Sequence, residues 1–533
     1  MSGSGGNTGG PGNNGGSGSA GGNGGRGGQR GGRGNGGPRD NSRRNAQGRE
    51  RNRGPQRNFT ENAPSQRSRR ADPARLVAFE VLRAVAAEDA YANLVLPARI
   101  RHHGLDKRDA GFATELSYGA LRGQGTYDAI LARCVDRPLA QLDPAILDAL
   151  RIGTHQLLAM RVPAHAALDQ TVGLARAVIG AGPSALINAV LRKVAAHSLE
   201  EWLELLVAGE TDETRIASLR HAHPEWIVRA MRQSLVAHGR SAAEITDLLE
   251  ADNAAPVVNL VALPGLGSLD EALENGATLG ELVAGSALSS GGDLGRLSSV
   301  REGTTRVQDV GSQLVARAMA AVDLGPELQG TAADGEAWLD LCAGPGGKAA
   351  LLGALASERG ATLLANEPAP HRAKLVSQAL SAVPRDTWRV RTGDGREVGT
   401  EQPAAYHRVL VDVPCSGLGA LRRRPESRWR RTPKDLADLG LLQRELLASA
   451  LAAVRPGGVV AYVTCSPHPA ETTAVVSDAL RKRDDLELLD AGTALDAVSL
   501  TGNLDAGHEA TAQLWPHIHG TDAMFLALIR KKA

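Results

Sequence analysis

Five short apolar runs, separated by segments long enough for helices, mark the chain from about residue 304 onward. The runs are EAWLDLC, TLLANE, WRVRTG, HRVLVDV and GGVVAYVTC. They are apolar at consecutive rather than alternate positions, which indicates strands that are covered on both faces. Such strands alternating with helices predict a doubly wound α/β domain with a parallel, Rossmann-like sheet. A ligand of this sheet is expected beyond the carboxyl ends of its strands.

A glycine-rich turn, DLCAGPGGKA at residues 340–349, follows the first run. It lacks the glycine and the hydroxyl residue that accompany the lysine of a phosphate-binding P-loop. Gly344, Gly346 and Ala349 formally satisfy a dinucleotide loop, with Glu367 placed to bind a ribose hydroxyl. In a loop for S-adenosylmethionine the glycines would instead allow close approach of the backbone. A turn that needs glycine for its geometry alone is the remaining alternative, and the density of glycine favours a ligand loop.

Two cysteines end later runs, Cys415 in VLVDVPCSG and Cys465 in VVAYVTCSP. A cysteine is often only a small buried hydrophobe, and we interpret Cys134 and Cys342 as structural or contact residues. Two thiols at strand ends beside one ligand loop predict nucleophilic chemistry instead.

The chemistry that needs this set is methyl transfer to C5 of a cytosine. A thiolate that adds to the neighbouring C6 makes C5 able to accept a methyl group. A carboxylate, here Asp412, can hold the base edge, and a second thiol can assist elimination of the C5 proton. The target base must leave its stack to reach such a site.

With these motifs the chain resembles the RNA 5-methylcytosine methyltransferases of the RsmB/Fmu (Sun) type. The matching stretches, in order over residues 304–533, are QDVGSQLVARAM, LDLCAGPGGK, RVLVDVPCSGLGALRRRPESRW, YVTCSPHPAET and LWPHIHGTDAMFLALIRK. The resemblance implies a class I methyltransferase domain that uses S-adenosylmethionine to methylate a cytosine of ribosomal RNA, in the small subunit.

The resemblance also implies roles for individual residues. Cys465 would be the nucleophile, Cys415 would help to eliminate the C5 proton and free the RNA, and Asp412 would orient the cytosine. Lys348 is placed for a carboxylate of the cofactor or for a phosphate. The cofactor would be held by Cys342, Ala343, Gly344, Pro345, Gly346, Gly347, Lys348, Glu367, Arg372, Asp394 and Asp412.

Six arginines and one tryptophan lie in residues 422–431, directly after the Cys415 turn. Guanidinium groups suit phosphates and an aromatic ring can stack on a base, so this stretch predicts RNA contact, with a solvated helix face as the alternative. The stretch HGTDAMFLALIRK reads as a closing antiparallel strand, with Phe525 in the core and His519 and Asp522 as candidates for the cytosine pocket. The predicted RNA-binding residues are Arg422, Arg423, Arg424, Arg428 and Trp429.

Residues 71–200 have helical periodicity and predict an all-α module whose first helix is capped by Asp72 before Pro73. LRIGTHQLLAM, HAALDQTVGLAR and LINAVLRKV resemble the NusB-like RNA-binding domain, which implies a helical bundle; an inert packing module is the alternative. Residues 201–300 predict a small α+β connector, with a helix in HPEWIVRAMRQSL and a strand in PVVNLVALPG. Residues 301–533 would form the methyltransferase domain.

Residues 1–70 hold 22 Gly, 13 Arg, no Lys and three acidic residues, a net charge of +10. The whole chain carries +1, so the remaining residues carry −9. A segment this poor in apolar residues is predicted to be a disordered arm. Its GGRGGQRGGRG stretch resembles RGG-type arms that bind RNA through phosphates, and a solubilising tail is the alternative.

The four cysteines show no CxxC spacing, so we predict neither a metal site nor a disulfide framework. Available thiols fit a reducing cytoplasm, and we expect no membrane segment and a monomer. Three other functions stay open at this point. They are a DNA cytosine methyltransferase that uses Cys415 alone, an RNA-binding ribosome-assembly factor with a methyltransferase fold, and a nicotinamide oxidoreductase.

Overall fold

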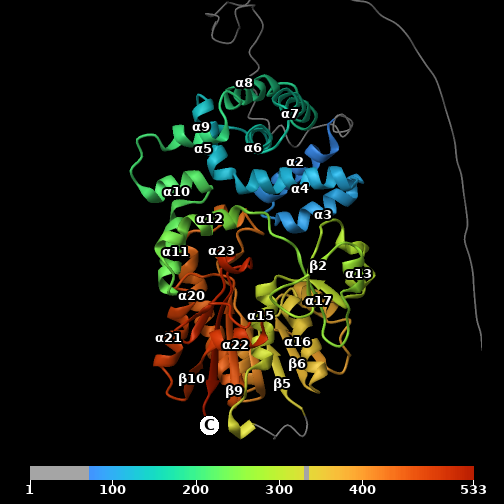
Figure 1. Ribbon diagram of the computed structural model, residues 1–533, viewed down its shortest axis with the longest axis vertical. Coiled ribbons are helices and arrows are strands. Elements are labelled where there is room, and N and C mark those ends of the chain that lie inside the picture. The colour runs from blue at the N-terminus through green and yellow to red at the C-terminus, as the bar shows by residue number, and fades with distance from the viewer. Residues whose placement is uncertain (1–70, 329–334) are drawn as a thin grey trace, which may run out of the picture. The chain divides into compact units, whose positions relative to one another are not determined.

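A computed structural model describes residues 71–328 and 335–533 (Figure 1). The predictions for the arm, residues 1–70, lie outside the described residues. In the described part of the chain no helix combines the length and the apolar character needed to cross a membrane.

The first region is entirely helical, as predicted. Asp72 caps its first helix: the carboxylate accepts a hydrogen bond from the backbone N–H of Arg75 at 2.9 Å, and Pro73 takes the first helical position. Leucine, isoleucine, valine and alanine side chains fill one continuous core between the helices. The helices are α2 (Pro73–Ala87), α3 (Ala92–His103), α4 (Lys107–Arg122), α5 (Gln124–Cys134), α6 (Pro144–Leu158), α7 (Ala164–Val178) and α8 (Ser184–Val194).

The connector combines helices with a small antiparallel sheet of order β2-β3-β1-β4. The predicted helix is α11 (Glu225–Ala237) and the predicted strand is β1 (Asn259–Ala262). Its sheet extends past residue 300, because β4 (Thr305–Val307) pairs with β1. The other elements are α9 (Leu199–Val207), α10 (Glu213–His221), α12 (Ile245–Asn253), α13 (Asp270–Glu274), β2 (Thr278–Leu279), β3 (Ser286–Leu288) and α14 (Ser298–Glu302).

The α/β domain is built on a sheet of order β11-β12-β13-β9-β8-β5-β6-β7, with β10 paired to β13. All five predicted strands are present and parallel to one another. Both faces are covered: Trp338 packs into the core on one face and its neighbour Leu339 into the core on the other, and both are fully buried. The five strands are β5 (Ala337–Asp340), β6 (Thr362–Glu367), β7 (Trp388–Thr392), β8 (Tyr406–Asp412) and β9 (Val454–Thr464).

Helices cover the two faces of this sheet (Figure 1). The core on one face includes residues of α15 (Val310–Ala321), α16 (Gly347–Glu358) and α22 (Ala491–Val498). The core on the other face includes residues of α20 (Pro433–Ala453) and α21 (Thr473–Arg481). The remaining elements are α17 (Pro370–Ala379), α18 (Gly395–Glu401), α19 (Ser427–Arg430), β10 (Leu486–Leu489), β11 (Gly507–His508) and β12 (Thr511–Gln513).

The closing strand is shorter than predicted. β13 (Phe525–Lys531) is antiparallel to β9, and Phe525 is fully buried as expected. His519, however, ends a short helix, α23 (Pro516–His519), and Asp522 lies in the following loop. The prediction of a strand at these two positions is wrong because Pro516 starts a helical turn and Gly520, at φ 63°, ends it.

Candidate functional site

The carboxyl ends of the parallel strands gather the predicted reactive groups at one edge of the sheet, as expected for this topology. Acidic residues end or follow four of the strands, and a thiol follows the fifth. These residues are Asp340 at the end of β5, Glu367 at the end of β6, Asp394 after β7, Asp412 at the end of β8 and Cys465 after β9.

The two thiols lie in contact. Strands β8 and β9 are parallel neighbours, and the loops that leave them bring the Sγ atoms of Cys415 and Cys465 to 3.3 Å. The hydrogen bond between the sulfurs raises the pKa of Cys415 well above its usual value, and burial adds to this effect. The same bond lowers the pKa of Cys465, and it outweighs burial. Cys465 is therefore the sulfur that ionises, and Cys415 keeps its proton.

A carboxylate and an ammonium group lie beside this pair. Lys348, in the first turn of α16, donates to Oδ2 of Asp412 at 2.8 Å. The Asp412 side chain keeps 29% of its surface exposed, whereas Lys348 keeps 13%. The positive charges of Lys348 and Arg424 favour the thiolate of Cys465. Lys348 was expected to meet a ligand anion; in the structure its partner is Asp412.

A buried carboxylate that the sequence patterns did not single out ties the two thiol loops together. Oε1 of Glu471 accepts from the backbone N–H of Ser416 at 2.8 Å, and Oε2 accepts from the Ser416 hydroxyl at 2.5 Å. That hydroxyl also lies 3.1 Å from Oγ of Ser466, and Gln443 donates to both Glu471 and the carbonyl of Pro414. Glu471 thus fixes Ser416, the residue after Cys415, and Ser416 contacts Ser466, the residue after Cys465, so the network links the two thiol loops.

The glycine loop packs on Glu367, which is 2% exposed. The backbone N–H of Gly344 donates to Oε2 of Glu367 at 3.1 Å, and Arg372 donates to the carbonyl of Gly344 at 2.6 Å. A Cβ atom at Gly344 would lie 2.1 Å from that Glu367 oxygen, so the approach requires glycine. Gly346 has a φ of 110°, which also favours glycine.

Asp340, which was not among the predicted site residues, and the remaining predicted residues near the loop differ in environment. Burial raises the pKa of Asp340 to about 7, and the neighbouring Asp412 adds to the shift. Burial likewise raises the pKa of the Cys342 thiol well above its usual value, which fits a contact residue rather than a nucleophile. Asp394 caps α18, and its hydrogen bonds to Arg396, at 2.6 Å to Nη2, lower its pKa. Ala343 and Gly347 lie in the same turn, and Pro345 is exposed at its tip.

The structure corrects the RNA-contact prediction for Arg422 and Arg428. Arg422 is buried and bonds to Asp522 at 2.8 Å and Asp309 at 2.9 Å. Arg428 is fully buried and donates to Asn253 Oδ1 at 2.8 Å and to the carbonyls of Arg122, Ala222 and Asp252 at 2.9–3.4 Å. These charges meet protein partners, so neither side chain is available for a phosphate.

The other three residues that were predicted to contact RNA lie in different environments. Arg423 shares Asp309 and Asp522 with its neighbour, at 2.6 and 2.9 Å. Trp429 is 39% exposed, and its ring edge meets Gly125 of α5 so closely that a Cβ atom there would lie 2.8 Å from it. Arg424 is exposed, and its guanidinium lies over the ring of Tyr91 at 5.0 Å.

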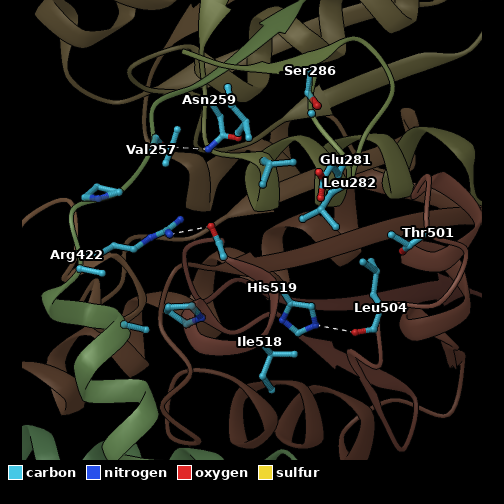
Figure 2. Close-up of a pocket in the computed structure, with 18 of the residues that line it drawn as sticks. Val257, Asn259, Glu281, Leu282, Ser286, Arg422, Thr501, Leu504, Ile518 and His519 are labelled. Carbon is cyan, nitrogen blue, oxygen red and sulfur yellow. Dashed lines mark hydrogen bonds between the residues drawn. The ribbon is translucent and has the colours of Figure 1, made fainter. Parts of the chain in front are cut away.

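His519 and Asp522 are also bound within the protein. His519 contacts the carbonyl of Leu504 at 2.8 Å, and Asp522 accepts from Arg422 and Arg423. His519 lines a cavity of about 590 Å³ between the connector and the C-terminal loops (Figure 2). Figure 2 shows Asn259 and Glu281 on one side of it and Ile518 and His519 on the other. Its lining includes neither Cys415 nor Cys465, so this cavity is separate from the thiol pair.

Comparisons with known proteins agree with this architecture. Residues 330–530 match the family model described as 16S rRNA methyltransferase RsmB/F, and residues 72–196 match the NusB family. The chain is 46% identical over 478 residues to the putative methyltransferase Rv1407 of Mycobacterium tuberculosis, covering 89% of this chain and 99% of the relative. It is 30% identical over 471 residues to a probable ribosomal RNA small subunit methyltransferase B of Synechocystis, covering 86% and 99%. The crystal structure of PH0851 has the same fold, with a TM-score of 0.70 at 21% identity over 86% of this chain and 99% of that one.

Proposed function

The chain belongs to the RsmB/F family of 16S rRNA methyltransferases, and on that premise we propose that it methylates C5 of a cytosine in small-subunit ribosomal RNA with S-adenosylmethionine as the donor. The observation that carries this proposal is the contact between two thiols of opposite pKa shift, 3.3 Å apart, beside Asp412. Hydride transfer by a nicotinamide oxidoreductase would leave this pair without a role.

The loop residues fit S-adenosylmethionine. Glycine at residue 344 lets the backbone reach Glu367, a buried carboxylate that suits a ribose hydroxyl. The carboxylate of Asp340 lies buried at the edge where the ligand is expected, and it has no side-chain partner in the described chain. Asp394 and Arg372 would complete the set. When bound, the cofactor supplies an electrophilic methyl group.

The first step falls to Cys465. Its thiolate would form a bond to C6 of the cytosine, and the C5–C6 π pair would move to C5. C5 would then bond the methyl carbon while the S–CH3 pair stays on the donor sulfur, which leaves as S-adenosylhomocysteine. Asp412 would hold the N3 and N4 edge of the base, and its ion pair with Lys348 fixes the carboxylate. The opposite pKa shifts of the two thiols favour Cys465 over Cys415 as the sulfur that attacks the base.

The second step falls to Cys415. Its pKa is raised chiefly by the hydrogen bond to the Cys465 sulfur. Once that sulfur is bonded to carbon it carries no negative charge, so the main cause of the raised pKa disappears. Cys415 can then lose its proton to solvent, and its thiolate can take the C5 proton; the C5–H pair re-forms the C5–C6 double bond and the S–C6 pair returns to Cys465. The adduct itself thus prepares the group that resolves it.

The test follows labelled methyl groups from S-adenosylmethionine into ribosomal RNA that lacks this modification. We expect wild type to place label in 5-methylcytosine of small-subunit RNA, and Cys465→Ala to place none. Cys415→Ala should attack but fail to release, which traps a protein–RNA adduct visible as a shifted band on a denaturing gel.

Cys134→Ala, which alters a buried thiol of the helical region, is the matched control and should label RNA as wild type does. Normal turnover by Cys415→Ala would contradict its role in release. An adduct that forms through Cys415 and does not need Cys465 would indicate that Cys415 is the nucleophile, as in the DNA cytosine methyltransferase alternative. Absence of label with folded, cofactor-bound wild type would favour an assembly factor.

A further inference from the structure

Gln308 is a buried residue whose side-chain amide has no hydrogen-bond partner among the described residues. It follows β4 and precedes α15, and it is 7% exposed. Both backbone groups of Gln308 have hydrogen-bond partners. The N–H donates to the carbonyl of Asn259 at 3.0 Å, and the carbonyl accepts from the Gln313 side chain at 2.9 Å. Neither Nε2 nor Oε1 of its side chain meets a hydrogen-bond partner in the part of the chain that the structure describes. Burying both groups unpaired is costly, which points to a ligand that pairs with them.

The amide lies beside the cofactor loop. Nε2 of Gln308 is 4.0 Å from the position that a Cβ atom on Gly347 would take, and Gly347 is the first residue of α16. The first N–H groups of a helix have no partner within the helix, and together they favour a negative charge. One donor and one acceptor of Gln308 therefore stand next to the N-terminus of a twelve-residue helix, which is suited to an anion.

The amino-acid end of S-adenosylmethionine matches this arrangement. It carries a carboxylate, which can accept from Nε2 and from the helix N-terminus, and an ammonium group, which can donate to Oε1. Lys348 would be the obvious partner for that carboxylate, but its ammonium group already bonds to Asp412 at 2.8 Å. The amino-acid end thus needs another polar partner, and Gln308 is buried, unpaired and adjacent.

We propose that Gln308 binds the amino-acid end of S-adenosylmethionine through both groups of its amide. This inference rests on the proposed function, because it concerns the cofactor of that same site. It adds a residue from the segment before the α/β sheet to the loop residues that the sequence suggests. The cofactor would then be held by two segments of the chain, QDVGSQ at residues 308–313 and DLCAGPGGK at residues 340–348.

The test is calorimetric binding of two unreactive ligands to the full chain. S-adenosylhomocysteine has the amino-acid end, and 5′-methylthioadenosine lacks it. For Gln308→Met, which keeps the length of the side chain, we expect the dissociation constant of S-adenosylhomocysteine to rise about 10- to 100-fold, as for the removal of a hydrogen bond to a charged group. The dissociation constant of 5′-methylthioadenosine should change less than about threefold.

Stability of the ligand-free protein separates binding from a structural role. Because the amide has no partner, Gln308→Met should melt at the wild-type temperature or above it. Gln513→Met is the matched control: this buried glutamine donates to the carbonyl of Leu514 at 2.9 Å, and its replacement should lower the melting temperature and spare the ratio of the two affinities.

Three results would overturn the inference. Equally weakened binding of the two ligands would place Gln308 away from the amino-acid end. Unchanged affinity for both, with a lowered melting temperature, would make it a structural residue. Failure of the wild-type protein to bind either ligand would overturn the proposal that S-adenosylmethionine is the cofactor. This outcome is distinct from the first two because it is seen in the wild-type protein without any variant.

Discussion

Two chemically identical side chains acquire opposite properties here through one contact. Cys415 and Cys465 share a hydrogen bond of 3.3 Å, and the cations around them are placed unequally. Asp412 raises the pKa of both thiols, but the charges of Lys348 and Arg424 oppose it at Cys465, whereas Glu471 adds to it at Cys415. At the scale of single residues, the division of labour between the thiols is therefore electrostatic.

This division can be measured without RNA. The alkylation rate of Cys465 by iodoacetamide, followed by peptide mass mapping across pH, should have its midpoint below the ordinary thiol value of about 8.5. In Cys415→Ala the thiolate loses its hydrogen-bond donor, so its pKa rises, the midpoint should move up, and the reaction at pH 7 should be slower. Cys134→Ala should leave the midpoint in place, and a midpoint that stays or falls in Cys415→Ala would refute the assignment.

The residue scale also shows where sequence patterns stop being informative. Asp72 as a cap and Phe525 as a core residue could be predicted, because local spacing determines both. The burial of Arg422 could not, because its partners Asp309 and Asp522 lie 113 and 100 residues away. Glu471 was missed for the same reason: a carboxylate near a nucleophile has no pattern that distinguishes a buried clamp from a surface charge.

At the scale of elements, the segment that follows the Cys415 turn holds three regions together. Arg422 binds Asp309 and the loop before β13, and Arg428 binds the end of α4 and the end of α12. Arg430 donates to carbonyls of residues 85 and 90, and Glu426 accepts from the backbone N–H of Ala92 at the start of α3. The arginine run at residues 422–431 thus mainly makes contacts within the protein that connect these regions, and we call it the joint. It follows the same loop that carries Cys415.

Removal of Arg428 should loosen this joint. Arg428→Ala leaves three carbonyls and the Asn253 side chain without their donor, so we expect the free energy of unfolding to fall by about 3 kcal/mol in urea titrations. Arg431→Ala is the control, since the described chain gives that half-buried guanidinium neither an ion pair nor a hydrogen bond, and its effect should stay within about 0.5 kcal/mol. Equal destabilisation by the two variants would mean that the segment is not a joint.

The strands were the most predictable elements. Each of the five apolar runs forms a parallel strand, because burial on both faces leaves a continuous signal in the sequence. The helical prediction for residues 71–200 is also confirmed, because the helical periodicity of the apolar residues is likewise visible in the sequence. The prediction for the Pro516 segment failed, because one helical turn of four residues carries no periodicity.

At the scale of the whole molecule, charge is divided unequally along the chain. Residues 1–70 carry +10 and the rest carries −9. A folded part of net negative charge does not attract RNA by its total charge, so we expect the arm to supply much of the non-specific affinity.

The arm can be tested by salt titration. Deletion of residues 1–70 should weaken binding to unstructured RNA and make the slope of log K against log salt shallower by about 0.7 for each phosphate that an arginine of the arm neutralises. Replacement of the arm by a Gly/Ser/Asn segment of equal length is the control for bulk, and it should behave as the deletion does. An unchanged slope would make the arm a solubilising tail.

The position of β13 has a consequence for synthesis. This strand is the last of the described chain, yet it lies between β9 and β12, and Phe525 pairs with Thr464, the neighbour of Cys465. While the ribosome is still translating residues 525–531, β9 remains an edge strand with its hydrogen-bonding groups free, a state prone to pair with other chains. The nascent polypeptide therefore holds its nucleophile on an unfinished sheet until residues 525–531 have been added. A stop codon that removes residues 525–531 should yield aggregated protein rather than a weakened enzyme.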